Sequence, residues 1–180
     1  MTTKNKPKSQ TEVTQTILDF LGDYKINEPD DVILLIKRVK DFLVFRDYNE
    51  KTKKHADSIQ WKRTVTEILN DGYVYNGKAC SDLVLIFITL CKAAGLEAQL
   101  LKLACVDGKK THSIAEFKFD NEWYRIDPSF TEPKPYKGYL GDDQLWNKNW
   151  DGGWRVWKRG DDLWSMGLDG IENESDIANE

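Results

Sequence analysis

Apolar residues recur at helical spacing through the first half of the chain. Residues 13–21 carry apolar side chains three and four positions apart, and a second series over residues 31–43 follows Pro29 and two acidic residues. A third series covers residues 58–69 and ends at an Asn-Asp-Gly stop signal. The pattern predicts three amphipathic helices, with the polar residues 47–57 as the connection between the second and the third.

The next apolar segment has a different character. Between residues 79 and 94 apolar side chains cover nearly the whole helical circumference and Gly95 supplies a stop, so a buried central helix is expected. The period then becomes strand-like in residues 97–105, 111–119 and 122–127, which turn signals separate. The predicted fold class is α+β, with N-terminal helices and a central buried helix, which carries a cysteine at its start, packed on an antiparallel β-sheet.

The length of 180 residues favours one domain with short appendages. Five of the seven tryptophans follow residue 130, and that region has no clear period. The expected organisation is a disordered polar leader (1–11), one domain (12–170) and a disordered acidic tail (171–180). The domain comprises a motif core (58–130) and a Trp-rich extension (131–170).

Charge and hydropathy exclude several classes of function. The formal net charge of -4 argues against a protein built to neutralise nucleic-acid phosphates. The longest apolar run, residues 83–91, is less than half of the roughly 20 residues that a membrane-spanning helix needs. The first eleven residues have no apolar core of a secretory signal. We therefore expect a cytoplasmic protein with no nucleic-acid or membrane partner, whose oligomeric state the sequence leaves open.

The three cysteines are candidates for chemistry because only two histidines accompany them. An odd number of cysteines without a CxxC pair suits reduced thiols better than disulfides or a zinc site, and phosphate-binding motifs are missing, so no metal or cofactor is expected. Cys80 lies at the predicted start of the buried helix, where the helix dipole stabilises a thiolate. Cys91 and Cys105 fall within apolar segments and are expected to be buried and inert.

A histidine and an aspartate are predicted to lie side by side on two strands. If Asp120-Asn121 forms a two-residue hairpin turn, paired positions sum to 241, so His112 and Asp127 are diagonal neighbours on one face. A carboxylate there can accept a hydrogen bond from an imidazole N–H and fix the tautomer of the ring. His55 lies in a charged stretch typical of a solvated segment. A lone strand histidine beside a carboxylate is also typical of a structural residue, so spacing alone leaves both interpretations open.

At this point the residues resemble those of the transglutaminase-like superfamily, from about Trp61 to Ser129. The resemblance is carried by Cys80-Ser81-Asp82-Leu83, by residues 90–98 at the helix exit, by His112-Ser113-Ile114-Ala115-Glu116-Phe117 and by Trp123-Tyr124-Arg125-Ile126-Asp127-Pro128-Ser129. It implies a papain-like fold in which Cys80 is the nucleophile, His112 the general base and acid, and Asp127 the residue that orients His112. The expected oxyanion donors are the Cys80 backbone N–H and one side chain, with Trp61, Gln60 and Asn76 as candidates.

The chemistry implied is acyl transfer on amide bonds of a peptide or protein, through a thioester on Cys80. Hydrolysis is favoured over cross-linking. The alternatives are a peptide N-glycanase-type amidase, a non-catalytic module that keeps the groove for peptide binding, and a structural module. Among the tryptophans, Trp123, Trp146 and Trp150 are candidates for a substrate groove, although covering of the sheet by the Trp-rich region is the favoured interpretation.

Overall fold

The computed structural model describes residues 8–174. Its elements in chain order are α1 (Gln15–Leu21), α2 (Asp31–Phe42), β1 (Val44–Arg46), α3 (Lys53–Ile59), α4 (Val65–Asp71), β2 (Tyr73–Tyr75), α5 (Cys80–Ala93), β3 (Ala98–Cys105), β4 (Thr111–Phe119), β5 (Glu122–Ile126), β6 (Tyr136–Lys137), β7 (Trp154–Gly160) and a short 3₁₀ helix, η1 (Trp164–Met166). The α+β fold class predicted from the sequence is confirmed.

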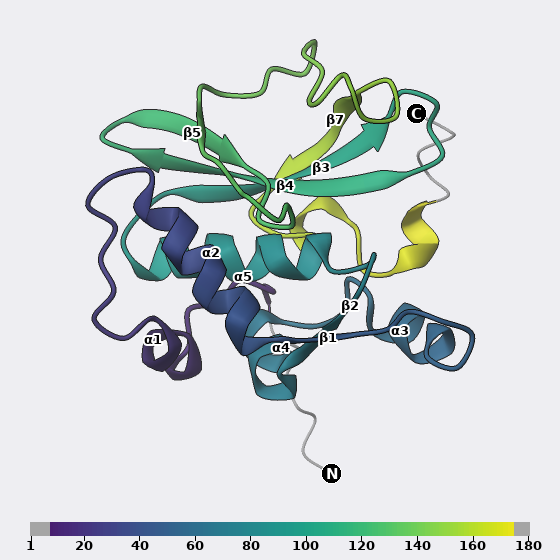
Figure 1. Ribbon diagram of the computed structural model, residues 1–180, viewed down its shortest axis with the longest axis horizontal. Coiled ribbons are helices and arrows are strands. Elements are labelled where there is room, and N and C mark those ends of the chain that lie inside the picture. Colours follow the sequence, from purple (N-terminus) through teal and green to yellow (C-terminus); the bar gives the residue numbers. More distant parts are fainter. Residues whose placement is uncertain (1–7, 175–180) are drawn as a thin grey trace.

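Helix α5 is the centre of the fold. It runs beneath an antiparallel sheet of strand order β6-β5-β4-β3-β7, and α1, α2 and α4 pack around it on the side away from the sheet (Figure 1). Its residues from Leu83 to Cys91 are all buried, as the apolar circumference predicts. Phe87 meets Phe117 of β4 edge-to-face, with the ring centroids 5.8 Å apart. Burial of this helix on all sides fixes the position of its first residue.

The opposite face of the sheet is covered by the segment that joins β5 to β7. This segment crosses above the sheet in Figure 1, and a second apolar cluster lies beneath it, built around Leu103, Ile114, Trp146 and Trp154. Glu116, fully buried on this face, accepts a hydrogen bond of 2.7 Å from the Leu140 backbone N–H and so holds the segment down. Much of the Trp-rich region therefore serves as packing.

The β4–β5 hairpin has the predicted register. Ala115 pairs with Ile126 and Phe119 with Glu122, and both pairs sum to 241. The turn residues Asp120 and Asn121 have φ values of 47° and 66°, which a two-residue type I′ turn requires of both its central positions. The register places His112 and Asp127 beside each other.

The predicted helix over residues 58–69 is wrong. Helix α3 ends at Ile59, the backbone reverses at Trp61 with φ 64°, and α4 starts anew at Val65. Thr64 and Glu67 form a capping box, a strong signal for a helix start that competes with the apolar spacing. The polar residues 47–57, predicted as a connection, include the first turn of α3.

Residues of both predicted terminal segments make contacts with the domain. The predicted disordered leader covers residues 1–11, but Gln10 is 1% exposed and its side-chain amide donates hydrogen bonds to the carbonyls of Trp61 and Arg63. At the other end Glu174, assigned to the acidic tail, accepts a hydrogen bond of 2.5 Å from Thr111. The rest of both predicted segments, residues 1–7 and 175–180, lies outside the described residues.

Candidate active site

Cys80 is the first residue of α5, directly after Ala79 at the N-cap. The turn before it reverses at Gly77, which has φ 72°. The Cys80 side chain is partly exposed, whereas Cys91, deeper in the same helix, is fully buried. The unpaired N–H groups of the first helical turn make this end of α5 partly positive, which favours the thiolate form of Cys80.

His112 is held from one side by a carboxylate. Its Nε2 lies 2.5 Å from Asp127 Oδ2, and both side chains are almost completely buried. The other oxygen of Asp127 accepts hydrogen bonds from Ser129, 2.9 Å from its backbone N and 2.6 Å from its Oγ. Because Nε2 faces Asp127, the second ring nitrogen, Nδ1, is the one available to the Cys80 thiol, with which the imidazole also interacts.

Two indole rings pack against the imidazole. Trp150 lies edge-on to His112 with centroids 5.0 Å apart, and the Trp154 ring centroid is 5.7 Å away. These contacts restrict rotation of the His112 side chain. They also remove water from beside the His112–Asp127 hydrogen bond, which strengthens that interaction.

Cys80 and His112 shift each other's pKa values: that of the thiol falls and that of the imidazole rises. Burial disfavours the Cys80 thiolate, but the hydrogen bond and charge of His112, with the charge of Lys102, lower the pKa of Cys80 to about 7. Burial likewise disfavours the imidazolium, but Asp127 and Cys80 raise the pKa of His112 to about 9. Between these values the pair exists as thiolate and imidazolium, the ionic form that a cysteine nucleophile needs. Burial raises the pKa of Cys91, which remains a thiol.

A cavity of about 580 Å³ opens above this pair. Cys80, His112, Asn76 and Trp150 contribute to its wall. The arrangement provides a nucleophile, a base that interacts with it, and space for a substrate beside both, which are the elements of nucleophilic catalysis. No group of three or more His, Cys, Asp or Glu side chains among residues 8–174 is placed to hold a metal ion.

Comparison with known proteins identifies the family of the chain. The profile of the Transglutaminase-like superfamily matches residues 23–128, more than half of the chain. The chain belongs to the transglutaminase-like superfamily. No curated protein sequence matches this member of the superfamily.

A solved structure shares this fold at low sequence identity. A proposed cysteine protease from Cytophaga hutchinsonii superposes with a TM-score of 0.52 at 12% identity, over 84% of this chain and 43% of that one. A TGase gives 0.46 at 13% identity over 74% and 34% of the two chains, and Legionella pneumophila LapG gives 0.44 at 16% over 93% and 92%. The present chain thus spans less than half of the length of the first two.

Of the three oxyanion candidates of this transglutaminase-like chain, Asn76 alone lines the cavity with Cys80. Trp61 is fully buried, and its indole nitrogen has no hydrogen-bond partner among the described residues. Gln60 lines a separate small cavity beside Arg63. Because α3 ends at Ile59 and α4 starts at Val65, neither residue lies on the continuous helix over residues 58–69 that the sequence predicted.

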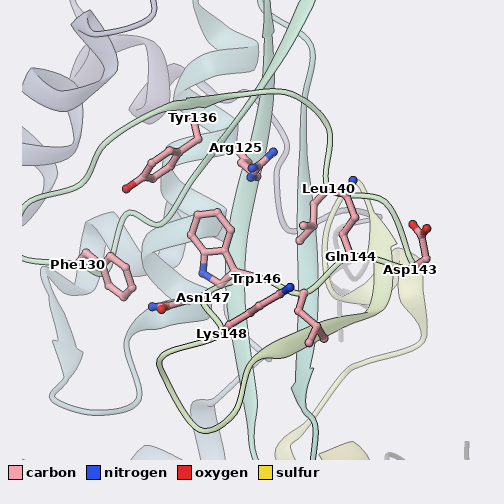
Figure 2. A pocket seen from close by; sticks show the side chains of 10 residues that line it. Arg125, Phe130, Tyr136, Leu140, Asp143, Gln144, Trp146, Asn147 and Lys148 are labelled. Carbon is pink, nitrogen blue, oxygen red and sulfur yellow. The ribbon is translucent and has the colours of Figure 1, made fainter.

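The three groove candidates are separated in the structure. Trp150 lies in the wall of the Cys80 cavity, and Trp146 lines a neighbouring cavity of about 650 Å³ between the sheet and the covering segment. Figure 2 shows Phe130 and Tyr136 on one side of this second cavity and Leu140 and Gln144 on the other. Trp123 lies on neither wall and packs edge-to-face on Tyr139, with centroids 6.2 Å apart.

Two polar residues at the site were not identified from the sequence. Ser129 supports Asp127, and Lys102 is a buried lysine near the start of α5. The signal for Lys102 was present, since it is one charged residue in the middle of an apolar strand, buried on both faces.

None of the helices within residues 8–174 is long and apolar enough to cross a bilayer.

Proposed function

We propose that this transglutaminase-like protein is a cysteine-dependent hydrolase of amide bonds in peptides or proteins. The observation that carries the proposal is the His112 imidazole, held by Asp127 through Nε2 and left with Nδ1 for the thiol of Cys80. This pair faces a cavity that is large enough for a peptide segment. A structural histidine would need neither the thiol nor the cavity.

In the proposed reaction the Cys80 thiolate attacks the amide carbonyl and the C–N bond then breaks. The His112 imidazolium donates its proton to the leaving amine, and a thioester remains on Cys80. His112, now neutral, takes a proton from a water molecule that attacks the thioester, which releases the acid and regenerates the thiolate. Asp127 keeps the ring oriented and stabilises its charged form throughout.

The developing oxyanion needs hydrogen-bond donors close to the sulfur. The backbone N–H of Cys80 is one donor in the proposed site, and the Asn76 side chain is the second, because of the three sequence candidates it alone shares the cavity. An Asn76→Ala variant is expected to lower kcat by about 10²-fold, the effect typical of losing one such donor.

The cavity wall favours water over an amine as the acceptor of the acyl group. Charged side chains surround its apolar and catalytic residues and keep it hydrated: Lys78, Lys109, Lys110, Asp151 and Glu174. An enzyme that transfers the acyl group to an amine must instead keep water from the thioester. We therefore place hydrolysis before cross-linking in the proposal.

Substrate binding is proposed to involve Trp150 first and the Trp146 cavity second. Phe130 of the second cavity lies 6.1 Å from the Trp150 ring, so one aromatic layer separates the two cavities. A peptide that crosses Trp150 could enter both. Trp123 is left out of this groove because it lines neither cavity. The proposal retains the cytoplasmic location expected from the sequence.

The test uses a panel of plain peptides, Gln-containing peptides and glycopeptides. Mass spectrometry detects a new peptide N-terminus, an ammonia assay detects side-chain deamidation, and an added fluorescent primary amine reports acyl transfer. The expected result is a cleaved or deamidated product from the wild type and none from Cys80→Ala. Dominant amine incorporation would refute hydrolysis, and release of the glycan-bearing amide would indicate an N-glycanase-type amidase. Peptide binding without any product would indicate a non-catalytic module.

A further inference from the structure

A lysine is buried directly behind the catalytic pair. Lys102, in the middle of β3, is 1% exposed, and its Nζ lies 3.3 Å from both Ser81 Oγ and Ser113 Oγ. Ser81 follows Cys80 in α5 and Ser113 follows His112 in β4, and the two hydroxyls are 2.8 Å apart. The ammonium group therefore contacts the residues next to the nucleophile and next to the base.

The surroundings of Lys102 offer little compensation for a charge. The ammonium contacts two neutral hydroxyls and the face of Trp61, whose ring centroid is 4.2 Å from Nζ. Because Ser81 lies in the first turn of α5, the ammonium also lies near the positive end of the helix dipole, where a cation is unfavourable. A buried lysine in such a place requires an anion nearby or loses its proton.

The anion at this place is the thiolate of Cys80. In the ionic form of the site Cys80 and Asp127 are negative and His112 is positive, and the carboxylate is already matched to the imidazolium at 2.5 Å. Lys102 supplies the second buried cation and makes the group neutral as a whole. We propose that Lys102 is a positioning residue that keeps Cys80 ionised and ties the first turn of α5 to β4 through Ser81 and Ser113.

Other charged groups around Lys102 do not replace this role. Glu174 and Lys78 act on Lys102 itself, and Lys40 acts on Asp127. Asp82, next to Ser81 in α5, is paired with Arg63, and Lys158 is the residue of β7 that pairs with Lys102. Glu174 and Lys78 line the open cavity, where water screens them, and Arg63 neutralises Asp82 at 2.6 Å. Burial lowers the pKa of Lys102 to about 8, and the negative charge of Cys80 opposes that effect.

The test follows alkylation of Cys80 by iodoacetamide against pH, with peptide mapping to separate the three cysteines. In Lys102→Met, which keeps the length of the side chain and removes its charge, the midpoint is expected to rise by at least about one pH unit. The rate below the midpoint then falls about tenfold. The matched control is Lys118→Met, a more exposed lysine paired with Glu97 at the far end of β4, which leaves the midpoint unchanged. An unchanged midpoint in folded Lys102→Met overturns the proposal.

A reciprocal measurement keeps the proposal testable if Lys102→Met does not fold. In the wild type and in Cys80→Ser, NMR of ¹³C-labelled lysine follows the ionisation of Lys102. Loss of the thiolate is expected to lower the pKa of Lys102 by about one unit or more, since coupling between two groups is mutual. An equal pKa in both proteins overturns the proposal. The inference rests on Cys80 as the nucleophile of the proposed function, but neither measurement needs a substrate, so a missing hydrolase activity would be recognised separately.

Discussion

Replacement of Asp127 by Asn tests the central electrostatic interaction of the site. The substitution keeps the shape of the side chain and removes the charge that lies 2.5 Å from His112 Nε2. With an effective dielectric constant of about 20 and charge centres about 4 Å apart, the interaction amounts to about 4 kcal/mol, or about 3 pKa units as an upper value. We expect the pKa of His112 to fall from about 9 by about 1–3 units.

The direction in which the pKa of His112 moves determines how activity changes with pH. The His112 imidazolium is present below its pKa, so a lower value removes the proton donor from the alkaline side of the pH profile first. The wild type is expected to have a bell-shaped profile of kcat/KM with limbs near the pKa values of Cys80, about 7, and His112, about 9. In Asp127→Asn the upper limb moves down and the bell narrows.

The assay is NMR titration of the imidazole resonances, which the chain makes simple because it has two histidines. His55 is exposed and bonded to the Tyr73 hydroxyl, so it serves as an internal reference. Asp162→Asn is the matched control, since Asp162 is equally buried at 2% but binds Gln10 and Ser165. A pKa of His112 that stays near 9 in folded Asp127→Asn would refute the electrostatic argument.

Three further predictions concern reactivity and stability. Iodoacetamide at about pH 6.5 should modify Cys80 well before Cys91 by peptide mapping, because a helix start and a basic neighbour favour the thiolate; equal rates would contradict this. Arg63→Met should lower the free energy of unfolding by about 3 kcal/mol in urea titrations, because Asp82, 2.6 Å away, loses its partner; a loss below about 1 kcal/mol would show that solvent replaces the pair. Phe117→Ala should cost about 3–5 kcal/mol in the same titrations, because its ring is fully buried under the sheet, and a smaller cost would indicate that the core collapses into the space.

Short-range sequence patterns were enough to predict the central helix and one hairpin. Helix α5 and the β4–β5 hairpin were predicted because apolar circumference and turn type are properties of a few neighbouring residues. The same rules failed at residues 58–69, where the capping box at Thr64 and the reversal at Trp61 prevailed over apolar spacing. Strand β7 was not predicted, because its pairing with β3 joins residues that are 49 to 60 positions apart in the chain.

The sequence by itself determined the class of fold and the three residues proposed for catalysis. Cys80 is singled out by its place at a helix start, and His112 and Asp127 by a register that a two-residue turn dictates, while the family resemblance supplied their proposed roles. The tertiary structure decided what surrounds them. It buried Trp61 outside the wall of the cavity, set Trp150 against His112, and buried Lys102 next to Ser81, the residue after the nucleophile. Such contacts depend on how α5, β3 and the segment before β7 pack together, and no pattern within one segment contains that information.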